Sequence, residues 1–214
     1  MSDETGIDDS TLSVVLDLRH PFSYLALGPA IQFARARGIE INWLPLTAQV
    51  LNTPSAPGPE DDRGILHRRS RAQMIAREVE AYGSVQGLTL RDYYRDSDPS
   101  AVYLGWHFLR QASQEMLEAY LTEIFRGYWC GELGPGDAEA VSKIVAGVGG
   151  DAAALRAFCD GDGPPVAAHA AAELSARGVT AGPGYLVQGE FFQGRQHLPM
   201  IDWILAGREG PGPI

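Results

Sequence analysis

The chain has 214 residues and a formal net charge of −10, from 17 lysine and arginine residues against 27 aspartate and glutamate residues. This balance argues against a surface for nucleic acid or an anionic membrane, because both partners need clustered basic side chains. No apolar run approaches the length of a membrane span, and the acidic N-terminus lacks the apolar core of a signal peptide. We therefore expect a cytoplasmic protein without nucleic-acid or membrane partners.

The N-terminal part predicts a strand, a helix and a second strand. Residues 12–17 favour a strand, and an amphipathic helix over 21–37 begins with a proline, which suits the first helical position. Residues 39–46 favour the second strand, so the two strands should run parallel with a right-handed crossover. The short turn before the helix aims the side chain of His20 at the positive end of the helix.

The middle of the chain predicts helices only. Residues 52–64 form a loop rich in proline, glycine and acidic residues, and its length indicates a lid or a domain edge. Every periodic segment between 66 and 162 then favours a helix. The expected helices cover residues 66–83, 99–112, 113–130, 137–147 and 151–160.

Strands return near the C-terminal end. The expected elements are a helix, two strands and a last helix, over 166–177, 185–188, 190–193 and 198–206. Gly182 and Pro183 stand just before the third strand, a position that suits a tight turn and a cis peptide bond. A cis bond would leave the backbone N–H and C=O of Gly182 facing an extended, peptide-like ligand, whereas an ordinary trans-proline at a strand start is the alternative.

The order of these elements predicts two domains. An α/β domain is expected from residues 10–65 and 165–208, with an all-helical domain inserted over 66–164. Residues 1–9 and 209–214 are expected to be flexible tails.

Cysteine usage limits the redox chemistry. Cys130 and Cys159 are the two cysteines, they lie far apart in predicted helices, and their spacing fits neither a CxxC motif nor a metal site. Disulfide exchange needs an attacking and a resolving thiol on one helix turn. The start of the first helix instead contains His20 and Ser23, so disulfide oxidoreductase activity is not expected.

Five motifs in order resemble the DsbA-like branch of the thioredoxin superfamily, specifically 2-hydroxychromene-2-carboxylate isomerases and kappa-class glutathione transferases. The motifs are Asp17–Leu25, Asn52–Pro54, Phe125–Trp129, Gly178–Tyr185 and Gly189–Leu198, within residues 12–206. The resemblance implies an α/β thioredoxin-like domain with an inserted all-helical domain. It also implies a homodimer, glutathione as the cofactor and an aromatic small molecule as the substrate.

The resemblance also implies a set of site residues. A family serine that hydrogen-bonds the glutathione sulfur is replaced by His20, and Ser23 adds a hydroxyl one turn on, so both are catalytic candidates. The candidate glutathione-binding residues are Asn52, Arg68, Gly182, Pro183, Arg195, Gln196 and His197. No metal ligand is expected. Phe22, Tyr24, Tyr128 and Trp129 either line an apolar substrate pocket or pack in the core.

Three departures from the family pattern leave the function open. Gln196 replaces an aspartate, Gly184 replaces a threonine or serine, and His20 replaces a serine. The helix dipole should lower the pKa of His20, so its imidazole could donate to a thiolate or act as a general base, with Asp17 orienting it. His107 and His169 are interpreted as packing or surface residues.

The leading hypothesis is a glutathione- or other thiol-dependent isomerase of an aromatic unsaturated carboxylate. One alternative is an enzyme of the same fold that does not use glutathione, with His20 as an acid–base group on a biosynthetic or degradative intermediate. A second alternative is a non-catalytic DsbA-like binding module.

Overall fold

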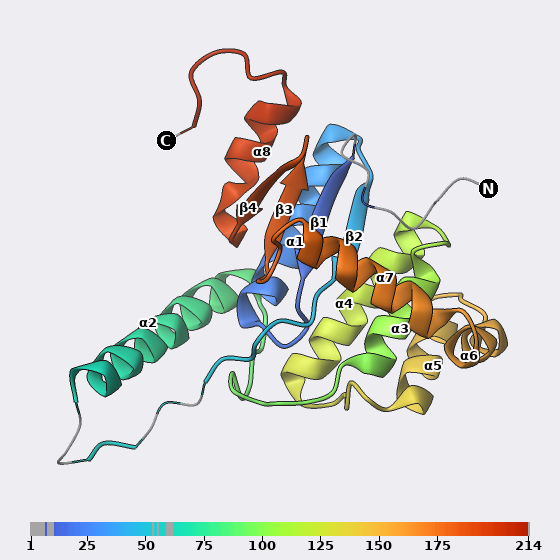
Figure 1. Ribbon diagram of the computed structural model, residues 1–214, viewed down its shortest axis with the longest axis horizontal. Helices are drawn as coiled ribbons and strands as arrows, with labels where there is room; N and C mark the ends of the chain where they lie inside the picture. Colours follow the sequence, from blue (N-terminus) through green and yellow to red (C-terminus); the bar gives the residue numbers. More distant parts are fainter. Residues whose placement is uncertain (1–6, 8–10, 53, 55, 59–61, 214) are drawn as a thin grey trace.

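A four-stranded mixed sheet organises the computed structural model, which describes residues 7, 11–52, 54, 56–58 and 62–213 (Figure 1). The strand order is β2-β1-β3-β4. Strand β1 (Leu12–Leu16) runs parallel to β2 (Ile41–Pro45) and antiparallel to β3 (Gly184–Val187), which pairs antiparallel with β4 (Glu190–Gln193). The predicted parallel strand pair is confirmed, with helix α1 (Pro21–Arg37) between its strands.

Helix α1 begins and ends where its sequence predicts. Pro21 takes the first helical position, where its missing N–H costs no hydrogen bond, and His20 is the N-cap. At the other end Gly38 adopts a left-handed conformation with φ 65°, and its N–H bonds to the carbonyls of Ala34 and Arg35. The cap therefore fixes the end of the helix before the chain enters β2.

Helices fill the chain between β2 and β3, as predicted. They are α2 (Arg63–Gln86), α3 (Ser100–Leu109), α4 (Gln114–Cys130), α5 (Ala138–Gly147), α6 (Ala152–Asp160) and α7 (Gly163–Ala176). Helix α7 begins three residues before the expected start at 166, because Pro164 and Pro165 fit the first turn instead of excluding it. After β4, a short 3₁₀ helix η1 (Arg195–His197) leads into α8 (Leu198–Leu205).

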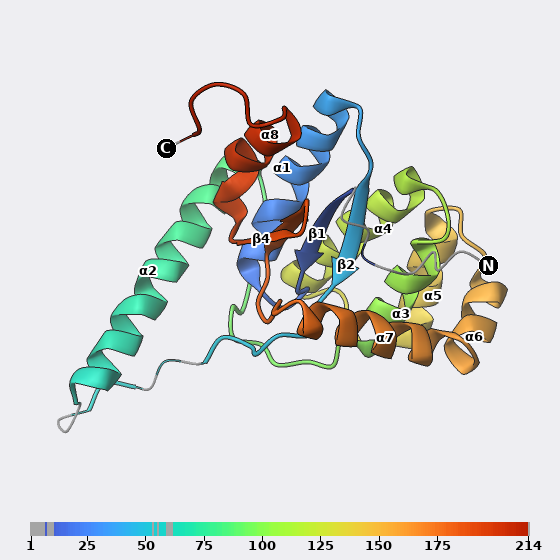
Figure 2. The same cartoon turned by 45° about the horizontal axis from the view of Figure 1, so that its top comes forward.

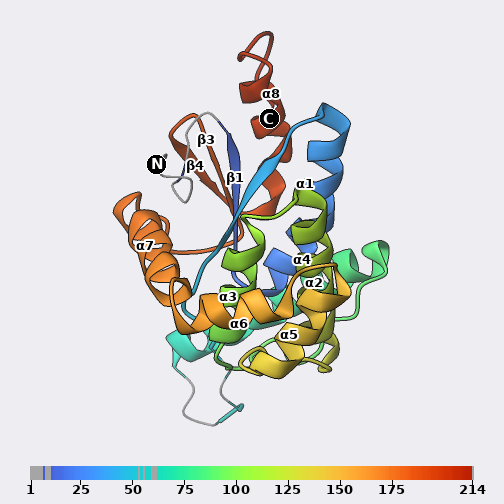
Figure 3. The same cartoon turned by 90° about the vertical axis from the view of Figure 1, so that its right-hand side faces the viewer.

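The two faces of the sheet are covered by different helices. Helix α7 covers one face (Figure 3). On this face Leu174 packs with Val15, Leu44 and Leu186. The other face packs against α1, α8 and the helical insertion (Figure 3). One continuous core thus joins the sheet to the inserted helices.

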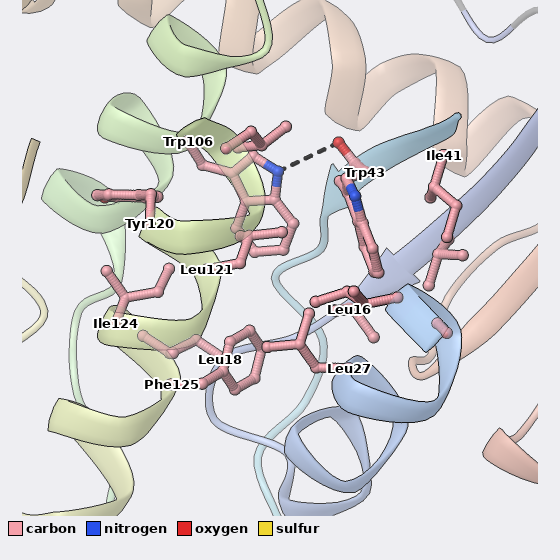
Figure 4. Close-up of a cluster of buried hydrophobic side chains, with 14 of the residues drawn as sticks. Leu16, Leu18, Leu27, Ile41, Trp43, Trp106, Tyr120, Leu121, Ile124 and Phe125 are labelled. Carbon is pink, nitrogen blue, oxygen red and sulfur yellow. Dashed lines mark hydrogen bonds between the residues drawn. The ribbon is translucent and has the colours of Figure 1, made fainter. Parts of the chain in front are cut away.

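Trp43 and Trp106 show how the insertion is attached. Both indoles are fully buried, and the Trp106 Nε1–H of α3 donates to the Trp43 carbonyl of β2 over 3.1 Å (Figure 4). Phe125 of α4 lies in the same cluster, with its ring centroid 6.5 Å from that of Trp106. Aromatic burial of this size contributes several kcal/mol, so α3 and α4 hold the β2 edge firmly.

Helix α2 is an arm that extends away from the rest of the molecule (Figures 1 and 2). Only Val79 and Gly83 of this helix are buried, both in its C-terminal part. Among the described residues, the exposed large apolar side chains all lie on α2, with exposed fractions of 51% for Leu66, 62% for Met74, 44% for Tyr82 and 87% for Val85. The Asp62 carboxylate caps the distal end by accepting from the Ile65 N–H over 2.7 Å, so the helix begins before the predicted residue 66.

The predicted C-terminal tail begins with backbone contacts to α8. The Trp203 Nε1–H lies 3.1 Å from the carbonyl of Glu209 and 3.3 Å from that of Gly210. Of the predicted N-terminal tail, residues 1–6, 8 and 9 lie outside the described residues, as does residue 214. Within the described part of the chain, no helix has both the length and the hydropathy to cross a bilayer.

Candidate active site at the start of α1

His20 lies at the N-terminus of α1 with its imidazole bonded to the helix. Its Nδ1 accepts the N–H of Phe22 over 3.3 Å, and its own backbone N–H donates to the Asp17 carbonyl over 3.1 Å. A neutral imidazole has one acceptor and one donor nitrogen. Because Nδ1 accepts, the proton is on Nε2, and His20 offers an N–H to anything that binds beside it.

The environment of His20 keeps this donor form at neutral pH. Burial lowers the pKa of His20 below the ordinary histidine value, and the negative charge of Asp17 opposes that shift only in part. The direction is the one predicted, but burial is the main cause where the sequence suggested the helix dipole. Protonation would also destroy the Nδ1 acceptor that caps the helix.

Ser23 is fully buried within the turn below His20. Its Oγ accepts the backbone N–H of Asp17 over 3.1 Å. This bond ties the end of β1 to the first turn of α1. The structure thus does not bring the Ser23 hydroxyl to an open surface beside His20.

The Asp17 carboxylate is the centre of a buried polar network. It accepts the backbone N–H of Arg19 over 2.9 Å, the Arg19 guanidinium at 3.2 Å and the N–H of Ala48 over 2.8 Å. The Tyr103 hydroxyl of α3 lies 3.1 Å from the same carboxylate. Asp17 therefore positions His20 through the backbone, while its side chain joins the β1 turn to the loop after β2 and to α3.

The Gly182–Pro183 peptide bond is cis and lies against the end of β1. A Cβ on Gly182 would stand 3.3 Å from both the Asp17 nitrogen and the Val15 carbonyl oxygen, so a glycine suits this close approach. Gly182 is buried, and its N–H and C=O have no hydrogen-bond partner among the described residues. Such orphaned backbone groups are rare and mark a place where a ligand backbone can pair.

Arg195 brings a positive charge to the same end of α1. Its guanidinium lies 5.7 Å from the ring centroid of Phe22 and 3.5 Å from that of Tyr82, and it forms a 2.7 Å ion pair with Glu78 of α2. The Gly194 N–H donates to the Pro183 carbonyl over 2.8 Å, which connects the turn before Arg195 to the cis-proline. The structure therefore brings His20, Gly182, Pro183 and Arg195 to one edge of the sheet.

The remaining predicted glutathione contacts are more scattered. His197 Nε2 bonds to the Gln193 carbonyl at 2.9 Å, and Gln196 is exposed beside it. Asn52 is exposed in the loop after β2. Arg68 lies ten residues before Glu78 on α2, about 15 Å along the helix, so the structure does not bring it to His20.

The structure also bears on the aromatic side chains of α1 and α4 and on the glycine at position 184. Tyr128 and Trp129 are each 1% exposed, which supports core packing over a pocket lining for these two side chains, whereas Tyr24, 6% exposed, packs in the core and also borders a cavity between α1 and the end of α2. At Gly184, a Cβ would stand 2.4 Å from Cε2 of Phe191, so the ring of Phe191 uses the space that a threonine or serine would fill.

A family model described as the DSBA-like thioredoxin domain matches residues 11–206. The chain belongs to this family. The fold of this DSBA-like chain, an α/β thioredoxin-like domain with a helical insertion, is the predicted one. A comparison with curated proteins found no match.

Solved structures share this fold at low sequence identity. A 2-hydroxychromene-2-carboxylate isomerase is 17% identical with a TM-score of 0.67, over 92% of this chain and 95% of that one. A probable DsbA oxidoreductase from Streptomyces coelicolor is 19% identical with a TM-score of 0.68, over 95% and 93%. The cytosolic disulfide reductase DsbM from Pseudomonas aeruginosa, with glutathione, is 14% identical with a TM-score of 0.61, over 92% and 98%. The resemblance to DsbA-like proteins that the five motifs indicate is confirmed for the fold, and an isomerase of the resembled kind is among the structures that share it.

The DSBA-like chain differs from a dithiol enzyme at the start of α1. His20 and Ser23 occupy the thiol positions, and Cys130 and Cys159 end α4 and lie in α6, respectively. Within the described ranges, no three histidine, cysteine, aspartate or glutamate side chains gather as metal ligands would. The groups that the structure places at this end of α1 are the imidazole of His20, the unpaired peptide of Gly182 and the guanidinium of Arg195.

Proposed function

We propose that the chain is a thiol-dependent isomerase of an aromatic unsaturated carboxylate, with glutathione as the thiol. The observation that carries the proposal is the hydrogen bond from the Phe22 N–H to His20 Nδ1, which fixes His20 as a neutral Nε2–H donor. Glutathione, when bound, would supply the sulfur nucleophile that adds to a conjugated carbon and leaves after the bond has rotated.

His20 would stabilise the negative charge on that sulfur. A hydrogen bond from a neutral donor to a charged group contributes about 1.5–3 kcal/mol. The N-terminus of α1 adds its positive end to the same place, since anions near a helix N-terminus gain about 0.3–1 kcal/mol or more. His20 would thus do what a serine does at this position in the resembled enzymes.

Gly182 and Arg195 provide groups for the rest of the tripeptide and the substrate. The unpaired N–H and C=O of Gly182 suit the cysteinyl backbone of an extended peptide. The Arg195 guanidinium suits a carboxylate of the ligand. In the free protein its 2.7 Å ion pair with Glu78 holds it near the ring of Phe22, and a ligand carboxylate would take the place of Glu78. The donor set therefore fits glutathione, although Gln196 brings no charge where relatives have an aspartate.

The hydrogen bonding of His20 disfavours the acid–base alternative. A general base needs an unprotonated nitrogen that faces the substrate, whereas the lone pair of Nδ1 is already engaged by the helix. At neutral pH the lowered pKa of His20 also leaves little imidazolium to act as an acid. The non-catalytic binding module would use the same unpaired backbone groups of Gly182 to bind its ligand, so it differs from the proposed enzyme only in the absence of turnover. A homodimer and a cytoplasmic location stay predictions.

Calorimetric titration with reduced glutathione, followed by turnover of 2-hydroxychromene-2-carboxylate, tests the proposal. We expect micromolar binding by the wild type and a roughly ten- to hundredfold weaker affinity in His20→Ala, from the loss of one charged hydrogen bond. His169→Ala removes an exposed histidine of α7 and should bind like the wild type.

Each outcome separates the hypotheses. Binding without turnover would support the binding module, and turnover without glutathione would support the acid–base enzyme. Absence of glutathione binding to the wild type would overturn the proposal, and so would an unchanged affinity in His20→Ala.

A further inference from the structure

A second concave site lies beside the segment of the chain that follows β2. It is a cavity of about 670 Å³ between the chain leaving β2, helix α3 and helix α7. Its volume lies within the range of small-molecule sites, about 300–1,000 Å³. None of the nine predicted site residues lines it. The cavity is therefore separate from the proposed glutathione site.

His107 is the most informative side chain in the wall of this cavity. It is only 3% exposed, and neither ring nitrogen has a hydrogen-bond partner in the described part of the chain: Nδ1 is fully enclosed by protein, whereas Nε2 is the ring nitrogen that a ligand can reach. A buried polar atom without a partner costs about 1–3 kcal/mol, so such atoms are uncommon unless they have a use. Burial and the nearby Arg110 lower the pKa of His107 to about 4, and the imidazole is neutral at pH 7.

The rest of the wall defines the chemistry of an occupant. Apolar side chains such as Leu46, Leu104 and Val179 make up much of it, with hydroxyls from Thr47 and Ser175. No aspartate, glutamate, lysine or arginine is among its lining residues. A charged molecule would lose its hydration there without gaining a counter-ion, which costs several kcal/mol.

We propose that this cavity binds a small uncharged molecule with an apolar, ring-sized body and one hydroxyl or carbonyl group, which hydrogen-bonds to the imidazole of His107. Nε2 of the neutral imidazole is a donor in one tautomer and an acceptor in the other, so it pairs with either group. Most of the ligand surface contacts the apolar wall. This inference does not depend on the proposed isomerase activity.

The cavity also adjoins the network that supports His20. Tyr103 lines the cavity, and its hydroxyl accepts the Leu18 N–H over 3.1 Å and lies 3.1 Å from the Asp17 carboxylate. An occupant of the cavity thus contacts a side chain that holds the turn before His20. Tyr103 connects the cavity to the turn before His20, but the two sites share no lining residue and can be tested independently.

Fluorescence titration with 1-naphthol, which is uncharged at pH 7, tests the site. We expect saturable binding of one molecule per chain. Ala171→Trp fills the cavity from an exposed position of α7, and we expect at least a tenfold loss of affinity. Ala172→Trp adds the same side chain one residue on, at an exposed position outside the cavity lining, and should bind like the wild type.

His107→Leu then tests the hydrogen bond. The variant should bind 1-naphthol about three- to tenfold more weakly, which is the loss of one neutral hydrogen bond. It should bind 1-methylnaphthalene, which has a methyl group in place of the hydroxyl, at least as well as the wild type does. Far-ultraviolet circular dichroism confirms that each variant is folded.

Four results would overturn the inference. They are no saturable binding of 1-naphthol to the wild type, an unchanged affinity in Ala171→Trp, an equal loss for both probes in His107→Leu, and binding that His20→Ala removes while Ala171→Trp leaves it intact. The last result would place the probe at the start of α1.

Discussion

Acid should destabilise this protein through His107, and the size of the effect follows from its burial. The pKa of His107 is lowered from an ordinary value of 6.5 to about 4, first by burial and then by the positive charge of Arg110. The unfolded chain therefore binds a proton on this histidine between about pH 6.5 and pH 4, whereas the folded chain does not. The contribution of neutral His107 to the free energy of unfolding is fully present above about pH 6.5 and is lost as the pH falls through this window.

The magnitude is a large fraction of the stability of a domain. A difference of about 2.5 pKa units at 1.36 kcal/mol per unit gives about 3 kcal/mol over the whole window. About 2 kcal/mol of this is already lost between pH 7 and pH 5. Typical domains have about 5–15 kcal/mol in total.

Urea denaturation of the wild type and His107→Leu at pH 7 and pH 5 measures the effect. The variant has no imidazole to protonate, so its loss of stability on acidification should be about 2 kcal/mol smaller. At pH 7 the variant should be as stable as the wild type or more so, because it removes a buried polar atom that has no partner. His169→Gln, which removes an exposed histidine, is the control. Parallel losses in the wild type and His107→Leu would refute the reasoning.

Three further substitutions test the framework of the site, with urea denaturation as the common assay. Asp17→Asn leaves the buried Arg19 charge without its carboxylate, so we expect a loss of about 3–5 kcal/mol, and a loss below 1 kcal/mol would contradict the assigned network. Tyr103→Phe removes the hydroxyl from the same network and should cost about 1–3 kcal/mol, where no change would be contrary evidence. Gly184→Ala forces a Cβ toward Phe191 and should cost about 1–3 kcal/mol, and a stable variant would show that the ring moves freely.

Local sequence signals predict most of the helices, because the residue types that cap the two ends of a helix can be read directly from the sequence. The glycine after α1, the serine before α4 and the aspartates before α5 and α6 cap these helices, and each cap lies within one residue of the expected end of its helix. The predicted start of a helix is wrong where a proline can either end one helix or occupy the first turn of the next. Two successive prolines, Pro164 and Pro165, favour a boundary between helices, whereas the first turn of α7 accommodates both of them.

The candidate site was predictable only where it depends on the backbone. The positions of His20 and of the cis peptide before Pro183 follow from the strand and helix order, so they were found. The burial of Ser23 and the ion pair of Arg195 with Glu78 depend on packing between distant segments. His107 was interpreted as a packing or surface residue, because nothing in its neighbouring sequence indicates a cavity formed with α7.

The α2 arm gives the molecule a strongly uneven electric field. Helix α2 carries five arginines and two glutamates, a net charge of +3 (5 − 2), so the rest of the chain carries −13 (−10 − 3). The arginines lie between residues 63 and 77, with acidic residues on either side at Asp62 and Glu78. The Debye length is about 8 Å at 0.15 M salt and about 30 Å at 0.01 M, so dilute buffer lets the arm of one molecule attract the body of another. We therefore expect retention on a cation exchanger at low salt despite a pI near 4.9, and loss of that retention at 0.15 M salt.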